Sequence, residues 1–122
     1  MIRSGDQYRD SIRGTREVYM NGDRVDNVTT HPMFKPIVDI RARIYDMQHE
    51  TATRDVMTVT DGDEVNAVGN ALPYSQEDWW AKRRASDLVM EKVGGVVTRV
   101  GDETVGEMLS LIHISEPTRQ KP

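Results

Sequence analysis

The sequence predicts a mainly helical fold with short β-hairpins, within one small domain at most for its 122 residues. Asn21-Gly22 stands between two short runs suited to β-strands, which indicates a tight hairpin. Apolar residues then recur every three or four positions over 36–49, which is the period of an amphipathic helix. A hydroxyl cap at Ser75 opens a longer helical pattern.

The first element expected is a helix over about 5–13. Ser4, followed three residues later by Gln7, has the form of a capping box, in which the hydroxyl and the amide satisfy free backbone groups at the helix start. Gly14 can adopt the left-handed conformation that often closes a helix. These two signals define where this helix starts and where it ends.

A hairpin is expected next, around Asn21-Gly22. A two-residue type I′ turn requires positive φ at both central positions, which Asn and Gly tolerate best. The flanking runs, Val18-Tyr19-Met20 and Asp23-Arg24-Val25, would be its strands.

The second helix is expected to start between residues 31 and 37 and to extend over about 36–49. Its start is indicated by two possible hydroxyl caps and two prolines whose φ suits a first helical turn: Thr29, Thr30, Pro32 and Pro36. One stripe should face a core: Ile37, Ile40, Ile44 and Met47. The outward face should carry Asp39, Arg43 and Asp46.

Residues 55–72 predict a second, irregular hairpin or loop, because apolar residues surround Asp61-Gly62 and Gly69. The sequence leaves its register open. The acidic residues of this segment lack the glycine and the distal glutamate of the twelve-residue calcium loop, so a turn is the favoured interpretation of Asp61, Asp63 and Glu64.

The longest helix is predicted from Ser75 to about Val97, with acidic residues in its first turn. One broad apolar face holds Ala81, Ala85, Leu88, Val89, Val93 and Val96, and the other face holds Arg84, Asp87 and Glu91. A stripe this wide predicts packing against further domains downstream. Trp79 and Trp80 project about 100° apart, so one is expected to enter the core while the other faces a partner surface.

Composition argues against several classes of function. The formal net charge of −4 comes without a clustered excess of Lys and Arg for nucleic acid. No run approaches the roughly 20 apolar residues of a membrane span, and the start lacks a signal-peptide pattern, so we expect a cytoplasmic protein. With Cys at 0, disulfides, thiolate metal sites and cysteine nucleophiles are excluded. The isolated His31 and His49 make no metal site.

Residues 16–36 resemble, in residue types and their order, the N-terminal domain of the 4-hydroxyphenylacetate 3-hydroxylase family. This family comprises flavin-dependent aromatic monooxygenases and a dehydratase branch. The likeness extends over residues 1–108, including 44–49 and 54–58. Members of the family are several times longer and have an acyl-CoA-dehydrogenase-like architecture. The resemblance implies a partial, truncated N-terminal helical domain that is inactive alone.

The last residues, 109–122, differ in kind from the rest. Residues 109–119 match what one reading frame of a common transposon-end sequencing adapter would encode, so we interpret 109–122 as a non-native tail. The alternative is a native short strand over 109–114 with a polar end that contains a proline.

The resemblance implies a substrate-binding role for Arg99, which falls on an arginine of the monooxygenase substrate pocket. A guanidinium near a phenol favours the phenolate by charge attraction. The implied reaction is ortho-hydroxylation of a small aromatic substrate with O2 and reduced FAD supplied by a separate reductase. In the relatives a tyrosine four positions later also holds the phenolic oxygen, whereas this chain has Glu103 there and Gly101 in place of a proline.

Three interpretations of Glu103 remain open: a different substrate, an acid or base role, or a pair with Arg99. From spacing alone, Arg99, Asp102 and Glu103 would form a solvated helix end. The sequence assigns no catalytic residue and no residue that contacts the flavin. In the relatives, FAD is held largely by a middle barrel and a C-terminal bundle, and the bundle also forms a homotetramer.

Two alternatives differ in function. The dehydratase branch, typified by 4-hydroxybutyryl-CoA dehydratase/isomerase, ligates an iron–sulfur cluster with cysteines near this arginine. Valine and glycine occupy those positions here, so the monooxygenase branch or an unassigned third branch is favoured. The other alternative is a non-catalytic helical interaction module that ends near residue 122.

Overall fold

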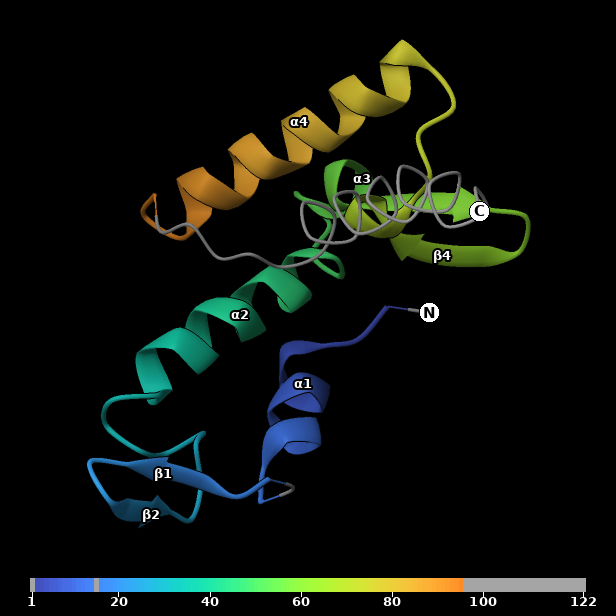
Figure 1. The fold of residues 1–122 in the computed structure, drawn as a ribbon. Coiled ribbons are helices and arrows are strands. Elements are labelled where there is room, and N and C mark those ends of the chain that lie inside the picture. Colours follow the sequence, from blue (N-terminus) through green and yellow to red (C-terminus); the bar gives the residue numbers. More distant parts are fainter. Residues whose placement is uncertain (1, 15, 96–122) are drawn as a thin grey trace, which may run out of the picture.

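The computed structural model describes residues 2–14 and 16–95, which form four α-helices, one 3-10 helix and two small antiparallel hairpins (Figure 1). In chain order the elements are α1 (Gly5–Ile12), β1 (Val18–Met20), β2 (Asp23–Val25), α2 (Lys35–Met47), α3 (Arg54–Met57), β3 (Thr58–Asp61), β4 (Glu64–Ala67), η1 (Val68–Asn70) and α4 (Gln76–Lys92). The helix α2 links two halves, with β1–β2 toward its start, α1 alongside it, and α3, β3–β4 and α4 beyond its end.

The first helix, α1, confirms the predicted capping box. Ser4 Oγ accepts a hydrogen bond from the Gln7 backbone N–H at 3.2 Å, and Gln7 Oε1 accepts one from the Ser4 N–H at 2.9 Å. The helix ends at Ile12, and Gly14 then has φ of +66°. Both ends of α1 therefore follow from local signals.

The hairpin β1–β2 turns at Asn21-Gly22 as predicted. Asn21 has φ of +53° and Gly22 has φ of +86°, which are the positive values that a type I′ turn requires. Strand residues pair as Val18↔Val25, Tyr19↔Arg24 and Met20↔Asp23. The register buries Val25 and leaves Tyr19 and Arg24 exposed opposite each other.

The start of α2 falls within the predicted window, but the predicted threonine caps are wrong. Thr29 Oγ1 donates to Asn27 Oδ1 at 2.6 Å, and Thr30 Oγ1 donates to the Asn27 carbonyl at 3.4 Å. Both hydroxyls are used in a local turn before the helix begins. The N-cap position is Phe34, which makes no side-chain cap bond, and Pro36 lies in the first turn.

The buried face of α2 differs from the predicted stripe. Ile44 and Met47 are buried as expected, but Val38 and Ala42 are buried in addition, and Ile37 is exposed. The cause is tertiary, because α1 packs on the side of α2 that presents Ala42. The predicted outward face of α2 is also only partly correct, because each of its three residues bonds to another segment. Asp39 bonds to Arg9, Arg43 to Glu50 and Asp46 to the Gly5 N–H.

The second hairpin is confirmed, and the structure supplies its register. Strands β3 and β4 pair as Thr58↔Ala67, Val59↔Asn66, Thr60↔Val65 and Asp61↔Glu64. Gly62, with φ of +58°, lies in the turn. The buried apolar residues stand at the ends of the hairpin, where Met57 precedes β3 and Val68 follows β4.

The long helix α4 begins as predicted but ends earlier. Ser75 Oγ accepts from the Asp78 N–H at 3.2 Å, which confirms the hydroxyl cap. The last helical residue is Lys92, not Val97, because Gly94 and Gly95 adopt φ of +72° and +80°. The Gly95 N–H donates to the Met90 carbonyl at 2.7 Å and closes the helix. Val96 lies outside the described residues.

One apolar cluster joins α2, α3, η1 and α4. Its buried members are Ile44, Met47, Met57, Val68 and Ala85, and the partly buried residues packed against them are Ala81, Leu88, Val89 and Val93. The predicted apolar face of α4 is thus confirmed up to Val93. The prediction that one tryptophan enters the core is wrong, because Trp79 and Trp80 are 60% and 54% exposed. Both lie more than about 100° around the helix from the centre of the buried stripe.

Candidate functional site

The residues predicted to bind substrate, Arg99 and Glu103, lie outside the described residues, as do Gly101 and Asp102. Their roles remain predictions. The proposed tail over 109–122 lies outside the described residues as well. The described residues show the part of the fold to which the segment beyond residue 95 is attached.

The departure point is the C-terminal end of α4. Val93 packs against the core, and the glycine pair Gly94-Gly95 then turns the backbone out of the helix. A left-handed conformation at both positions favours glycine, since a side chain there would be strained. The anchored end of α4 therefore sets where the chain starts toward Arg99.

A buried lysine is the main functional group that the sequence analysis missed. Lys82 is 9% exposed, and its Nζ donates to the Gly69 carbonyl at 2.9 Å. This bond ties η1 to α4 beside the apolar cluster. Burial of an ammonium group is costly without hydrogen bonds, so this contact is specific. Helical projection places position 82 at the edge of the apolar stripe, which was the available signal.

The charged groups between α1 and α2 form a network rather than a reactive site. Asp39 accepts from Lys35 Nζ at 2.5 Å and from Arg9 Nη2 at 3.1 Å. Lys35 first, and then Arg9, hold the pKa of the Asp39 carboxyl below its ordinary value by hydrogen bonds to its charged form. Asp39 in turn raises the pKa of Arg9. Such pairs keep both groups charged and unreactive near neutral pH.

Two further carboxylates are held in the charged form by structural contacts. The guanidinium of Arg43 lowers the pKa of Glu50, to which it forms a bidentate pair. The backbone N–H of Tyr74 and the cap at Ser75 lower the pKa of Asp78. These carboxylates therefore serve as caps and ion-pair partners.

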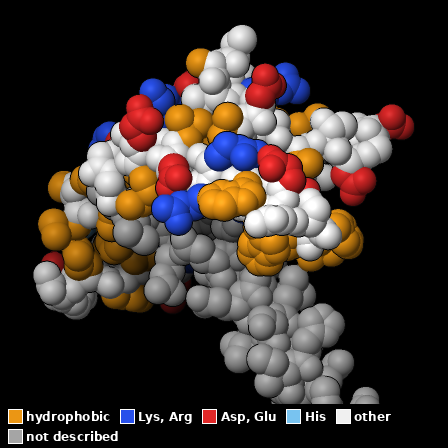
Figure 2. All heavy atoms as spheres, turned by 90° about the horizontal axis from the view of Figure 1, so that it is seen from above, with side chains coloured by type: hydrophobic (Ala, Val, Ile, Leu, Met, Phe, Trp, Pro, Cys, Tyr) orange, Lys and Arg blue, Asp and Glu red, His pale blue; other side chains and the backbone are white. Residues whose placement is uncertain are grey.

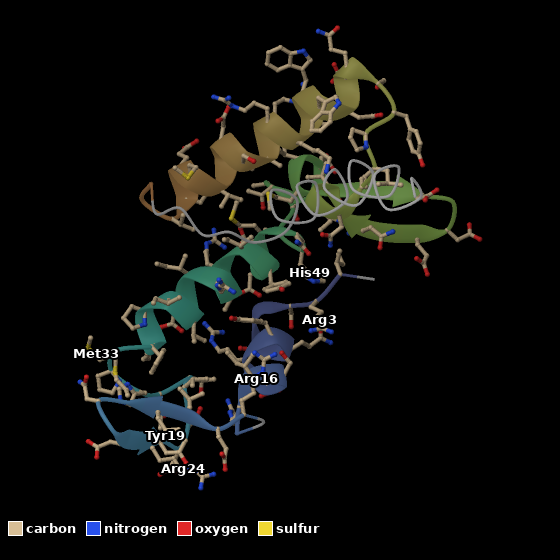
Figure 3. All side chains as sticks on the ribbon, in the orientation of Figure 1. Arg3, Arg16, Tyr19, Arg24, Met33 and His49 are labelled. Carbon is tan, nitrogen blue, oxygen red and sulfur yellow. The ribbon has the colours of Figure 1, made fainter. Side chains whose placement is uncertain are left out.

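His31 makes local contacts, and the structure assigns no role to His49. His31 Nδ1 accepts from the Met33 N–H at 3.2 Å, and its ring contacts Phe34. His49 is exposed just after α2 (Figure 3). Within residues 2–14 and 16–95, no group of three or more His, Cys, Asp or Glu side chains could hold a metal ion. The acidic turn at 61–64 belongs to the second hairpin.

Exposed apolar side chains gather at two ends of the described fold. At one end, Tyr19 projects from the hairpin away from α2, and Met33 stands before α2 (Figure 3). At the other end, four large side chains surround the start of α4: Leu72, Tyr74, Trp79 and Trp80. None of the helices in the described part is long and apolar enough to cross a membrane.

The starts of α1 and α4 are poor sites for a flavin nucleotide. A pyrophosphate binds where free backbone N–H groups converge. At the start of α1, the Gly5 N–H already donates to Asp46 Oδ1 at 2.7 Å. At the start of α4, the carboxylate of Asp78 occupies the cap and would repel phosphate. The residues at these two helix starts do not fit FAD.

Residues 4–121 match the family described as "4-hydroxyphenylacetate 3-hydroxylase N terminal". The 2,4,6-trichlorophenol monooxygenase of Cupriavidus pinatubonensis is 33% identical over 96 residues, covering 78% of this chain and 19% of that protein. The oxygenase component of 4-nitrophenol 4-monooxygenase/4-nitrocatechol 2-monooxygenase of Rhodococcus opacus is 39% identical over 100 residues, covering 80% of this chain and 19% of that protein.

A solved structure has the same local arrangement. The oxygenase component of 4-hydroxyphenylacetate 3-monooxygenase, complexed with FAD and 4-hydroxyphenylacetate, superposes with a TM-score of 0.70 at 27% identity. The superposition covers 74% of this chain and 19% of that one. The chain thus spans about a fifth of the length of the relatives it matches.

Proposed function

Because the chain belongs to the 4-hydroxyphenylacetate 3-hydroxylase family, we propose that it forms the N-terminal part of a phenol hydroxylase. The enzyme would be the oxygenase component of a two-component system that uses O2 and reduced FAD from a separate reductase. The observation that carries this proposal is the family match over residues 4–121. The truncation and the inactivity of the 122-residue chain alone belong to the same proposal.

The substrate class proposed is a small phenol. The names of the matched proteins share a phenolic ring with different substituents: trichlorophenol, nitrophenol and 4-hydroxyphenylacetate. This common chemistry supports a phenol and leaves the ring substituents open. A cation near the phenolic oxygen would favour the phenolate by charge attraction, and the phenolate is the more electron-rich ring.

Arg99 is the residue proposed to supply that cation. Its guanidinium would hold the phenolic oxygen, while Glu103 stands where relatives carry a tyrosine. An ionised carboxylate cannot donate a hydrogen bond to a phenolate. Glu103 would therefore select a different substrate, act as an acid or base, or orient Arg99 by pairing with it.

The cofactor proposed is FAD, held mainly by polypeptide beyond this region. When bound and reduced, the flavin supplies the activation of O2. The capped starts of α1 and α4 support a flavin site elsewhere in the enzyme. The described residues would contribute by holding α4, and so by positioning the segment that follows Gly95.

The domain limits are also part of the proposal. We assign residues 1–108 to the native domain and residues 109–122 to a non-native tail. Sequencing the source gene across position 108 would test this division. A native reading frame that departs from the present one after about residue 108 supports it, and a frame that retains 109–122 contradicts it.

The test of function uses a longer protein in which this chain replaces the matching region of the Rhodococcus opacus oxygenase component. Supplied with reduced FAD, O2 and 4-nitrophenol, it should oxygenate the ring and consume the 4-nitrophenol. Arg99→Ala should lower the rate of this oxygenation about 10²-fold or more, as expected for loss of a substrate-orienting charge, and should leave flavin oxidation nearly unchanged. Arg99→Lys, which keeps the charge, should recover part of the rate.

Equal loss of hydroxylation and flavin oxidation in Arg99→Ala would contradict the substrate assignment. A Glu103→Tyr variant separates the roles of the neighbouring residue. Higher activity toward 4-nitrophenol in this variant would support a changed substrate preference in the native chain. A loss of activity would support an acid, base or pairing role for Glu103.

A further inference from the structure

The start of α4 carries an exposed apolar surface within residues 72–80. Leu72, Trp79 and Trp80 are each more than half exposed, and Tyr74 is 87% exposed. Figure 2 looks down on this side of the molecule and shows hydrophobic side chains standing among charged ones. Isolated soluble proteins rarely expose such a surface, and Trp and Tyr are enriched at protein contacts. These four residues are called here the α4 entry patch.

The described fold does not use this patch for its own core. The helix α4 packs inward through small and aliphatic residues such as Ala81, Ala85 and Leu88. Trp79 and Trp80 project from other sides of the same helix and remain exposed. Folding of the described region therefore gives no reason for two large indoles at these positions.

The backbone beneath the patch is fixed by hydrogen bonds. Asp78 Oδ2 accepts from the Tyr74 N–H at 2.8 Å and from the Ser75 N–H at 2.9 Å. Lys82 Nζ anchors the following turn to the Gly69 carbonyl at 2.9 Å. A surface that is already ordered loses little conformational entropy when a partner covers it. The patch is therefore preorganised for contact.

Paired charges lie next to the patch on α4. Arg84 Nη2 lies 2.6 Å from Glu77 Oε1, and Arg83 Nε lies 3.0 Å from Asp87 Oδ1. These pairs largely cancel, so this side presents an apolar centre with a polar and nearly neutral rim. Such a surface matches another apolar protein surface better than a charged ligand.

We propose that the α4 entry patch is the docking surface for the polypeptide that follows this region in the full-length oxygenase component. The inference rests on the proposed function. The same region makes up 19% of the solved oxygenase chain it matches, so about four fifths of that protein lies outside the region and is available to cover the patch. The patch gathers four large exposed apolar side chains within residues 72–80, whereas Tyr19, Met33 and Ile37 are spread over residues 19–37.

Hydroxyl-radical footprinting with mass spectrometry tests the proposal, because it reads side-chain exposure peptide by peptide. The 122-residue chain is compared with the longer protein that carries the remaining polypeptide of the Rhodococcus opacus relative. Oxidation of Tyr74, Trp79 and Trp80 should fall at least about five-fold in the longer protein, since the centre of an interface is shielded from solvent. Oxidation of Tyr19 is the internal control and should fall less.

Unchanged oxidation of the patch in the longer protein would overturn the proposal. Oxygenation of 4-nitrophenol by the same protein separates the two ideas. Protection of the patch without hydroxylation contradicts the proposed function and leaves the docking surface supported. Hydroxylation without protection contradicts the docking surface alone.

A second measurement needs only the 122-residue chain. The double variant W79S/W80S should shift its Tm by less than about 4 °C, as expected for exposed side chains outside the core. A fall of more than about 8 °C would show that the indoles stabilise this chain itself, and would overturn the proposal. Association of the wild-type chain into dimers that the double variant abolishes would also overturn it, in favour of a second copy as the occupant.

Discussion

The two sides of α2 are held by different kinds of interaction. On one side, from Asp39 to Asp46, α2 meets α1 through polar contacts, in which the Gly5 N–H donates to Asp46 and Arg9 pairs with Asp39, together with stacking of Tyr8 on Tyr45 at 5.0 Å. Toward its end, α2 meets α3, η1 and α4 through a buried apolar cluster around Met47. One helix thus joins a polar interface to an apolar core.

The difference shows how stability and geometry are divided in this small fold. Burial of apolar surface is non-directional and supplies most of the favourable free energy. Hydrogen bonds and ion pairs contribute less on balance but require defined positions. The core therefore stabilises the molecule, and the α1–α2 interface sets where α1 lies. Substitutions on the two sides should differ in size and in extent.

The largest effect is expected from Met47→Ala. The Met47 side chain is 0% exposed at the centre of the core, so truncation leaves a cavity. The free energy of unfolding should fall by about 2–5 kcal/mol. Urea denaturation followed by circular dichroism would measure this change, and hydrogen exchange should increase in α2, α3 and α4 together.

The matched control is Met33→Ala, because Met33 is 63% exposed. It should change the free energy of unfolding by no more than about 0.5 kcal/mol. Similar losses for the two methionine variants would mean that the apolar cluster does not dominate stability.

A smaller effect is expected from Gly5→Ala at the polar interface. An added Cβ would lie 2.6 Å from Asp46 Oδ2 and 2.7 Å from the Ala42 carbonyl oxygen. The carboxylate can move only by losing its bond to the Gly5 N–H, and the carbonyl can move only with α2. Overpacking of this kind should cost about 1–3 kcal/mol.

Hydrogen exchange should locate the effect of Gly5→Ala in α1 and the second half of α2, which holds Ala42 and Asp46. Asp10→Ala, an exposed change in the same helix, serves as the control and should leave exchange in α2 unaltered. Uniform loosening of α4 in Gly5→Ala would show that the two interfaces are not separate.

Acid should weaken the polar interface more than the core. Lys35 and Arg9 lower the pKa of Asp39 in the folded state, so its contribution is present above the unfolded pKa of about 3.9 and is lost as pH falls through the lower folded pKa. Tm should therefore decline as pH falls below about 4.

The variant Asp39→Asn isolates this contribution. It should lower Tm slightly at pH 7 and reduce the further loss of Tm on acidification, because the group no longer titrates. Added salt should narrow the gap between variant and wild type at pH 7, since the partners of Asp39 are partly exposed. A gap that grows with salt would contradict the ion-pair explanation.

The elements that the sequence predicted well are those with local causes. The capping box at Ser4, the turn at Asn21-Gly22 and the hydroxyl cap at Ser75 each depend on atoms within a few residues. The early end of α4 also had a local signal, because Gly94-Gly95 favours left-handed backbone. An apolar pattern that continues past the two glycines predicted a longer helix than forms.

The errors arose where distant segments decide the outcome. The inner face of α2 depends on the position of α1, which helical periodicity does not contain. The same holds for Lys82, which is buried because η1 places the Gly69 carbonyl beside it. The exposure of both tryptophans follows from which face of α4 the core occupies. The proposed roles of Arg99 and Glu103 came from resemblance and stay predictions.

By itself, the sequence determined the starts of α1 and α4, the two turns and membership of its family, because these depend on short-range backbone preferences and on the order of residues along the chain. Tertiary structure alone decided which side of each helix is buried, which charges are paired and which aromatic side chains remain exposed. The physical reason is that burial and pairing depend on segments far apart in sequence. Helical periodicity describes a face of a helix but does not say what will cover it.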